Sequence, residues 1–390
     1  MKVLFYTHSF APNVGGQETI VMLQAQGLAW TNSSASAQAV ELTLATPTPR
    51  DGMNDAVLPF RVVRQPSRST LFQLVRNADI VHLAGPILLP MGLALLLRKP
   101  ILVEHHGFQT ICPNGQLLYV PDQSPCPGHF MARRYGSCLR CNHHRGKLRA
   151  LKAWLLTFLR RWLCQRVTVN VLPTTWLGTL LQLNRMETIV HGLPPLQRTL
   201  GMRPAPPLPI FVFVGRLVTT KGIHILLEAA QLLKSRGLQF GVKIIGEGPE
   251  RDALEKLVRH LRIQDIVFFL GYVPDDALEE ALADTTAVVI PSLAGEVFGM
   301  VAAQNMQRGK LVIASDIGAL SEVVANTGMR FAPGDASALA NCMESVIRNP
   351  SIGEELAQKG PERVARCFPA DLMIKEHLQL YQELCRSRLT

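Results

Sequence analysis

Residues 287–315 carry the pattern that most restricts the fold of this chain. The run AVVI (287–290) is typical of a short buried strand, the apolar positions from Met300 to Met306 predict a helix, and LVIAS (311–315) predicts a second strand. A strand, a helix and a strand in this order form the unit of a parallel sheet, which leaves a ligand crevice at the carboxyl ends of its strands. The residues predicted at that edge are Ser292, Gly295, Glu296, Phe298 and Gly299.

The turn before the predicted helix suits a phosphate group. Gly299 lets a ligand approach the backbone closely, and the amides after it open a helix whose N-terminus favours anions. Glu296 precedes this helix, and Gln304 lies about one and a half turns into it. We therefore expect both side chains to point toward one bound molecule from different sides.

The length and composition indicate a globular protein with two domains. A chain of 390 residues with 47% hydrophobic residues is long enough for two separate cores. The start of the chain, KVLFY (2–6), predicts a buried strand rather than a signal peptide, and no run of eighteen uncharged apolar residues follows. We therefore expect a cytoplasmic protein.

The order of the predicted elements is that of an α/β fold. Strands are predicted at residues 2–6, 40–46, 61–63 and 78–83, and a buried helix is predicted at 88–97. The proline-rich segment 194–209 predicts a linker. The expected domains are thus residues 1–193, with a cysteine-rich and basic insertion at 107–166, and residues 210–370, followed by an amphipathic helix at 371–390.

The residues around Glu296 resemble the nucleotide-sugar motif of retaining GT-B glycosyltransferases of the family 4 type, which usually reads Glu, seven residues, Glu. Glu296 matches the first acid, whereas Gln304 stands at the position of the second. The resemblance implies that Glu296 holds the donor sugar, Gln304 the ribose, and the backbone from Phe298 to Val301 the phosphates. A neutral glutamine cannot make the charge-assisted hydrogen bond that a glutamate would make to the ribose. We expect this difference to weaken donor binding by about 1–2 kcal/mol.

A second match to this family lies at the start of the second domain. Gly215, Arg216 and Lys221 surround a turn after a predicted strand, and two cations there would stabilise a departing diphosphate. The family also has a glycine loop after its first strand, matched by Gly15 and Gly16, although a simple tight turn explains this pair equally well. Glu322 matches the last motif of this family. The alternative interpretation is an acidic residue near a helix N-terminus that interacts with the helix dipole. The donor-binding residues implied by the resemblance are Gly15, Gly16, Gly215, Gly246, Tyr272, Val273, Phe298, Gly299, Met300, Val301, Gln304 and Glu322.

A pair of histidines ends the strand ILVE (101–104). His106 stands six residues before Cys112-Pro113, the spacing at which the family has a histidine near the donor sugar. This spacing favours His106 over His105, although adjacent histidines at a strand end are often structural. The catalytic residues implied by the resemblance are His106, Arg216, Lys221 and Glu296.

The insertion contains four cysteines, two of them in the sequence CLRC. Four thiols of this kind suit a structural zinc ion, and a reducing cytoplasm argues against a permanent disulfide. The spacing is looser than in common zinc ribbons and three histidines compete as ligands, so inert thiols remain the alternative. The candidate zinc ligands are Cys112, Cys126, Cys138 and Cys141, and the competing histidines are His129, His143 and His144. The resemblance implies that the transfer reaction itself needs no metal or other cofactor.

The positive net charge of +10 has a local origin. Eleven Lys and Arg residues and no acidic residue lie between Asp122 and Glu187. Within this segment, residues 147–166 predict an amphipathic helix with Leu151, Trp154, Leu155, Phe158 and Trp162 on one face and basic residues opposite. The apolar face either packs against the sheet, which we favour, or meets an anionic membrane surface together with the basic face of 145–166. No nucleic-acid-binding module is recognised.

These features predict a GT-B fold, with two Rossmann-like domains whose parallel sheets face each other across a cleft. The implied function is a retaining glycosyltransferase that moves a sugar from a UDP- or GDP-sugar to a sugar or lipid-linked acceptor in cell-envelope polysaccharide or glycolipid synthesis, in the cytoplasm or at the inner face of the membrane. Two alternatives stay open: a non-catalytic donor-binding or scaffold protein, because of Gln304, and a nucleotide-sugar epimerase.

Overall fold

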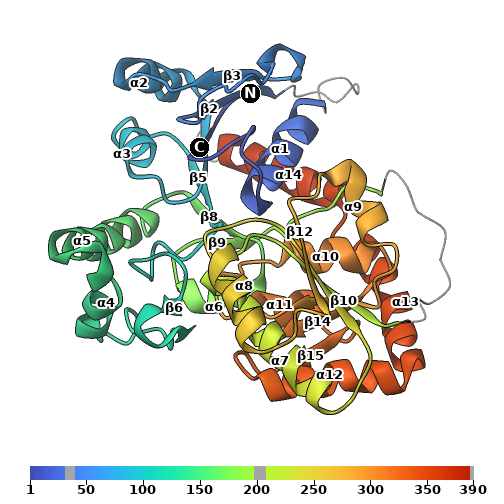
Figure 1. Ribbon diagram of the computed structural model, residues 1–390. Coiled ribbons are helices and arrows are strands. Elements are labelled where there is room, and N and C mark those ends of the chain that lie inside the picture. The colour runs from blue at the N-terminus through green and yellow to red at the C-terminus, as the bar shows by residue number, and fades with distance from the viewer. Residues whose placement is uncertain (31–39, 197–207, 387–390) are drawn as a thin grey trace. The chain divides into compact units, whose positions relative to one another are not determined.

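The chain forms two compact units (Figure 1). The computed structural model describes residues 1–30, 40–196 and 208–386. The first unit comprises Met1–Gly115, Gly128–Pro194 and Phe368–Thr390, and the second comprises Gln116–Pro127 and Pro195–Cys367. Most of the predicted linker 194–209 lies outside the described residues.

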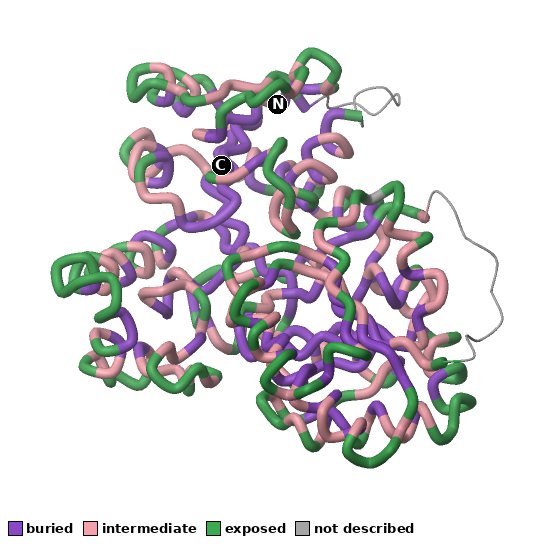
Figure 2. Tube along the Cα trace, viewed as in Figure 1, coloured by how far each residue is buried: buried purple, intermediate pink, exposed green. Residues whose placement is uncertain are grey.

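The first unit is built on a seven-stranded sheet with the strand order β3-β2-β1-β4-β5-β8-β9, and every neighbouring pair is parallel. Its strands are β1 (Lys2–Thr7), β2 (Glu41–Thr46), β3 (Arg61–Arg64), β4 (Ile80–Ala84), β5 (Ile101–Glu104), β8 (Val169–Leu172) and β9 (Met186–Thr188). The central strands are buried along their whole length, as expected for a parallel sheet that is covered on both faces (Figure 2).

The helices of this unit include one from the end of the chain. They are α1 (Gly16–Trp30), α2 (Arg68–Asn77), α3 (Leu88–Leu96), α4 (Tyr135–Cys141), α5 (Lys147–Cys164), α6 (Thr175–Leu181) and α14 (Ala370–Arg386), with 3-10 turns at Asp55–Val57 and His143–Arg145. Helix α14 contributes Met373, Tyr381 and Leu384 to the hydrophobic core of the first unit. Helix α14 therefore belongs to the first unit, although it follows the second unit in the sequence.

The second unit is built on a six-stranded sheet with the order β12-β11-β10-β13-β14-β15, again entirely parallel. Its strands are β10 (Ile210–Val214), β11 (Gly241–Ile245), β12 (Val267–Gly271), β13 (Ala287–Ile290), β14 (Leu311–Ser315) and β15 (Met329–Phe331). Its helices are α7 (Ile223–Ser235), α8 (Arg251–His260), α9 (Asp275–Ala281), α10 (Met300–Gln307), α11 (Gly318–Val324), α12 (Ala336–Arg348) and α13 (Pro350–Cys367), with a 3-10 turn at Thr219–Lys221. The strand, helix and strand predicted at 287–315 are therefore β13, α10 and β14.

The predicted insertion 107–166 does not belong to one unit, which corrects the expected domain boundaries. Residues 116–127 form an antiparallel hairpin of β6 (Leu118–Tyr119) and β7 (Ser124–Pro125), joined by a 3-10 turn at Val120–Asp122. Leu118 is 3% exposed and lies in the hydrophobic core of the second unit, as does Leu293. Burial of this side chain places the hairpin with the second unit rather than the first.

Helix α5 lies where the sequence predicts it, but the orientation expected for its apolar face is wrong in part. Trp154 and Phe158 pack against Phe130 and Tyr135, as a packed face requires. The residues buried along the helix are Ala150, Thr157, Leu163 and Cys164, whereas Leu148, Leu151, Leu155, Leu159 and Trp162 are exposed (Figure 2). The side chains that α5 buries are mostly small, so this face of the helix can pack closely. The larger apolar side chains lie on its exposed face. Along the described parts of the chain, no helix is both long and apolar enough to span a bilayer.

Candidate active site

The strand order of the second unit reverses between β10 and β13. In open parallel sheets the loops after the two strands at such a point diverge to opposite sides, and ligands bind between them. The loop after β10 carries Gly215, Arg216 and Lys221, and the loop after β13 carries Ser292 and Glu296. The two segments that the sequence analysis connected to one ligand thus lie at the expected binding edge of one sheet.

Backbone contacts hold these two loops together. Leu293 and Ala294 both donate their N–H groups to the carbonyl oxygen of Thr220, at 2.8 and 3.3 Å. Gly222 has φ +63°, and a Cβ at this position would lie 2.0 Å from the carbonyl oxygen of Pro291. Only glycine permits both this left-handed conformation and this close approach.

Three side chains meet across the two loops, and we call them the Lys221–Glu296–Ser292 cluster. Lys221 Nζ donates to Glu296 Oε1 at 2.5 Å, and Ser292 Oγ donates to the same oxygen at 2.8 Å. The side chains of Lys221 and Glu296 are 24% and 10% exposed, so a ligand can reach both while the protein fixes their positions. The cluster therefore places a cation and an oriented carboxylate beside each other at the open edge of the sheet.

Glycines also bring the ends of β10 and β11 into contact. A Cβ on Gly246, where φ is +132°, would lie 1.9 Å from the carbonyl oxygen of Gly215. Next to this contact, Leu217 donates its N–H to the carbonyl of Glu247 at 2.9 Å. Arg216 is exposed at this edge. The Arg216 side chain is thus available to an anionic ligand.

Helix α10 begins at the same edge. Gly299 precedes it with φ +100°, and Phe298 anchors the turn because its side chain is only 1% exposed. No described side chain caps the helix, so its first amides are available to an acceptor from outside the helix. Met300, Val301 and Gln304 are half-buried along it. This geometry is that of an anion site at a helix N-terminus.

The other predicted donor residues occupy three places. Tyr272 and Val273 follow β12 at the same edge of the second sheet, and Tyr272 is 59% exposed. Glu322 lies in α11, where its backbone carbonyl accepts from Arg363. In the first unit, Gly15 immediately precedes α1 and Gly16 is its first residue.

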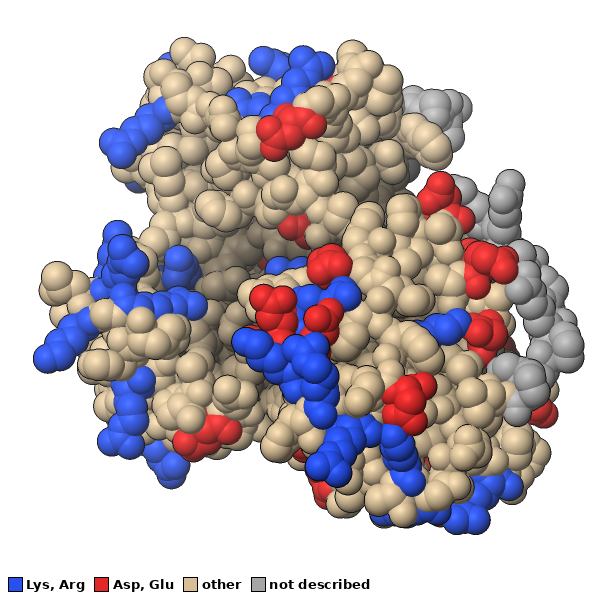
Figure 3. All heavy atoms as spheres, viewed as in Figure 1, with Lys and Arg blue, Asp and Glu red and all other residues tan. Residues whose placement is uncertain are grey.

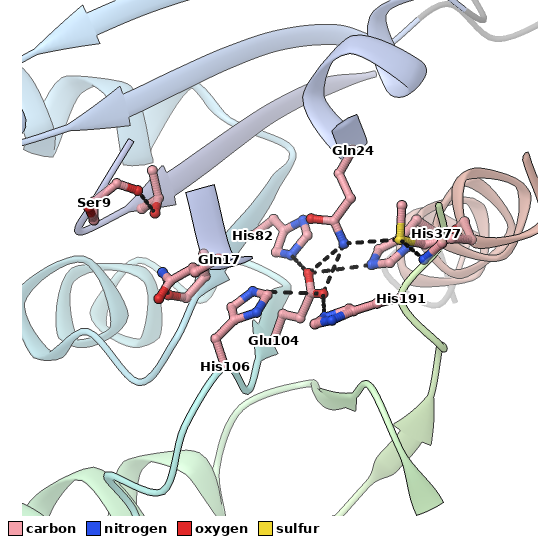
Figure 4. Close-up of polar contacts among 12 residues, drawn as sticks. Ser9, Gln17, Gln24, His82, Glu104, His106, His191 and His377 are labelled. Carbon is pink, nitrogen blue, oxygen red and sulfur yellow. Dashed lines mark hydrogen bonds and ion pairs between the residues drawn. The ribbon is translucent and has the colours of Figure 1, made fainter. Parts of the chain in front are cut away.

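His106 belongs to a buried cluster around Glu104 in the first unit (Figure 4). Burial lowers the pKa of His106 to about 3, against the opposing charge of Glu104, so its ring is neutral near pH 7. Its ring stacks on His191, with the centroids 5.2 Å apart. Burial likewise lowers the pKa of His105 to about 4, and His105 Nε2 is bonded to Asn170 Oδ1 at 2.9 Å.

Glu104 is the centre of this cluster. Burial alone would raise the pKa of its carboxyl group, but the neighbouring side chains of His106, His191, His377 and His82 hold that pKa well below its usual value. Gln24 Nε2 lies 2.9 Å from both carboxylate oxygens. The sequence analysis placed Glu104 at a strand end but missed its partners, because Gln24, His82, His191 and His377 share no local pattern and are contributed by distant segments.

The predicted cysteine site stays a prediction. Cys138 and Cys141 lie in α4 and are buried, and Asn114 Nδ2 donates to Cys141 Sγ at 3.4 Å. Within the described residues, two groups of at least three side chains present metal-ligating atoms within 4.8 Å of one another. Both groups contain Glu104 and histidines, and neither contains a cysteine.

Comparison with known proteins gives a family match for part of the second unit. Residues 203–363 match the family model described as glycosyl transferases group 1. The matched residues include both loops of the candidate site, the start of α10, and Gln304 and Glu322.

Curated sequences are similar to part of the chain. An uncharacterized glycosyltransferase of Methanocaldococcus jannaschii is 31% identical over 175 residues, which are 44% of each chain. A glycogen synthase of Mycobacterium tuberculosis is 31% identical over 172 residues, 44% of this chain and 41% of that protein. The chain thus matches these relatives over less than half of their own length.

Solved structures match the whole chain. Sucrose-phosphate synthase of Thermosynechococcus elongatus superposes with a TM-score of 0.73 at 21% identity and covers 99% of both chains. Anabaena HepE in complex with UDP-glucose superposes with a TM-score of 0.72 at 17% identity and covers 98% of this chain and 100% of that one. The predicted GT-B fold, with two Rossmann-like domains, is thereby confirmed.

Proposed function

We propose that the protein is a retaining glycosyltransferase, which transfers a sugar from a nucleotide sugar to a hydroxyl group. The observation that carries this proposal is the Lys221–Glu296–Ser292 cluster, which joins the loops after β10 and β13 at the reversal point of the sheet. An oriented carboxylate can accept from sugar hydroxyl groups, and the adjacent ammonium can bind a diphosphate oxygen. The match of residues 203–363 to the group 1 glycosyl transferase model supports the same reaction.

Each element of the site has a role in this proposal. The diphosphate binds at the first amides of α10 and beside Arg216 and Lys221, whose charges stabilise the negative charge that builds up as the glycosidic bond breaks. Ser292 donates to Glu296 and thereby fixes the carboxylate that holds the sugar. The acceptor hydroxyl attacks the face that the diphosphate leaves, so the anomeric configuration is retained. The predicted role of His106, which lies in the first unit, stays a prediction.

Donor binding gives the first test. A UDP-sugar is the donor we propose, because a structural neighbour is a complex with UDP-glucose. UDP-glucose at saturating concentration is expected to raise the melting temperature of the full-length protein by several degrees, since a ligand at 100 times its Kd stabilises the folded state by about 2.7 kcal/mol. The check is a thermal-shift series with UDP-, GDP- and ADP-sugars at matched concentrations.

The matched variant for this series is Gln304→Glu. It restores the acid that the related motif has, and it is expected to tighten binding of the preferred donor about 10-fold through a charge-assisted bond to the ribose. No stabilisation by any nucleotide sugar would contradict the proposal. Stabilisation without transfer or hydrolysis of a labelled donor would instead favour a non-catalytic binding protein, for which the unusual Gln304 is the specific observation.

We also propose that the acceptor is presented at an anionic membrane surface, as in the synthesis of envelope glycolipids or polysaccharides. Helix α5 supports this step, because Leu148 is 84% exposed and Trp162 is 53% exposed, and the other members of the exposed row are Leu151, Leu155 and Leu159. Lys and Arg residues gather over the same part of the molecule (Figure 3). An exposed apolar row beside positive charges is typical of a helix that lies in the headgroup region of a membrane.

Vesicle binding tests the membrane proposal. The full-length protein is expected to co-sediment with vesicles that contain anionic phosphatidylglycerol and to bind neutral phosphatidylcholine vesicles at least about 10-fold more weakly, since each basic residue near an anionic surface contributes about 1 kcal/mol. Replacing Leu155 with Glu should remove most of this binding. Leu372→Glu, at an exposed leucine of α14, is the control. Equal binding of wild type and Leu155→Glu would overturn the proposal.

A further inference from the structure

His82, Glu104 and His377 form a triad of fully buried side chains in the first unit (Figure 4). They come from β4, β5 and α14, so segments nearly 300 residues apart in sequence meet here. The imidazole Nε2 atoms of His82 and His377 lie 3.1 and 3.7 Å from the same carboxylate oxygen, Glu104 Oε2. The three ligating atoms lie within 4.8 Å of one another.

The second ring nitrogen of each histidine has a fixed partner. His377 Nδ1 lies 2.8 Å from the backbone carbonyl oxygen of Met373, and a carbonyl only accepts, so Nδ1 carries the hydrogen. His82 Nδ1 lies 2.6 Å from the hydroxyl of Tyr381. Histidines that bind metals are oriented in this way, with the other ring nitrogen bonded to a carbonyl or another polar group.

The remaining ring nitrogen of His377 faces the carboxylate. His377 Nε2 lies 3.7 Å from Glu104 Oε2, is buried and has no hydrogen-bond partner. A buried polar atom without a partner is costly, and a metal ion between these two atoms would satisfy both of them.

The distances suit a metal ion. His377 Nε2 and Glu104 Oε2 are 3.7 Å apart, which is longer than a hydrogen bond. Two ligands at about 2.0–2.2 Å from one tetrahedral ion lie roughly 3.3–3.6 Å from each other. The geometry points to a divalent transition-metal site, such as a zinc site, formed by Glu104 Oε2, His82 Nε2 and His377 Nε2.

Gln24 supplies the fourth polar group of this site. Its Nε2 now contacts Glu104, and its Oε1 is buried without a hydrogen-bond partner. Turning the amide by half a rotation would put this oxygen in the place of Nε2, beside Glu104. We infer that it is then the fourth ligand. Imidazole, carboxylate and amide ligands suit Zn²⁺ and its first-row neighbours. A closed site of this kind is structural and joins α14 to the sheet, so the ion takes no part in sugar transfer.

Metal binding to the full-length protein tests this site. The protein is stripped with a chelator and titrated with Zn²⁺, with bound metal measured after gel filtration. Wild type is expected to bind one ion that His377→Gln does not bind. Zn²⁺ should also raise the melting temperature of wild type and leave that of His377→Gln unchanged. The double variant Cys138→Ser/Cys141→Ser should keep this ion, which separates the triad from the predicted cysteine site.

A second variant separates loss of the metal site from misfolding of the protein. Tyr381→Phe leaves all three ligands in place and removes only the hydroxyl that orients His82, so Zn²⁺ affinity is expected to fall 10- to 100-fold. Co²⁺ bound to the double cysteine variant should give weak d–d bands and no thiolate charge-transfer band. The proposal is overturned if the double cysteine variant binds no ion, or if folded Tyr381→Phe binds Zn²⁺ with wild-type affinity.

Discussion

Lys221→Ala is expected to lower kcat for sugar transfer by about 100- to 1000-fold, the effect of removing one charge-stabilising group from a transition state. Lys221 Nζ lies beside Glu296 Oε1, at the edge where the diphosphate is proposed to bind. Its ammonium interacts more strongly with the departing diphosphate than with the intact donor, because negative charge accumulates as the bond breaks. The effect should therefore appear in kcat more than in KM. The measurement is the initial rate with the donor that the thermal-shift series selects.

Two further variants divide the roles within the cluster. Glu296→Gln keeps the size of the side chain and loses its charge, so it should lose transfer to a similar extent, whereas Ser292→Ala should lose about 10-fold because Glu296 remains but is less well oriented. Lys359→Ala breaks an exposed ion pair with Glu355 on α13 and is the control. Lys221→Ala with the rate of the control would refute the proposed role of the cluster.

Gly222→Ala is expected to destabilise the second unit by about 3 kcal/mol or more, which lowers its melting temperature by roughly 6–12 °C. Two costs combine. An alanine at φ +63° is strained, and its Cβ would lie 2.0 Å from the carbonyl oxygen of Pro291, so the loops after β10 and β13 must separate. Because the cluster spans these loops, sugar transfer should fall together with stability.

Gly237→Ala is the matched control for this prediction. Gly237 has a similar φ of +75°, but a Cβ there meets no atom within 4 Å. Its substitution should therefore carry only the conformational cost of about 1 kcal/mol and leave transfer unchanged. The difference between the two variants, measured by thermal unfolding, is the contribution of the close approach. Equal melting temperatures would show that the loops can separate freely.

The sequence was most informative where strand, turn and helix follow each other directly. The segment from β13 to β14 has an apolar run, a glycine turn and a second apolar run, and each of these is a local signal. Parallel sheets bring the carboxyl ends of their strands to one edge, so the meeting of Lys221 with Glu296 followed from the predicted topology. The fold class and this part of the site could therefore be predicted without coordinates.

The buried histidine cluster could not be predicted in this way. His82 and His377 are separated by most of the chain, and neither has a spacing that indicates a ligand. The hairpin at 116–127 was assigned to the wrong domain because a contact of one leucine with a distant core has no local signal. The exposed row of α5 was misjudged for a related reason: helical periodicity shows that an apolar face exists, but not whether another element covers it.

Helix α14 makes the first unit discontinuous in sequence. Met373, Tyr381 and Leu384 fill a core whose other members lie before residue 190. During synthesis from the N-terminus, the complete second unit leaves the ribosome before the first unit has its last helix. The core of the first unit is therefore incomplete in the nascent chain until α14 has been synthesised.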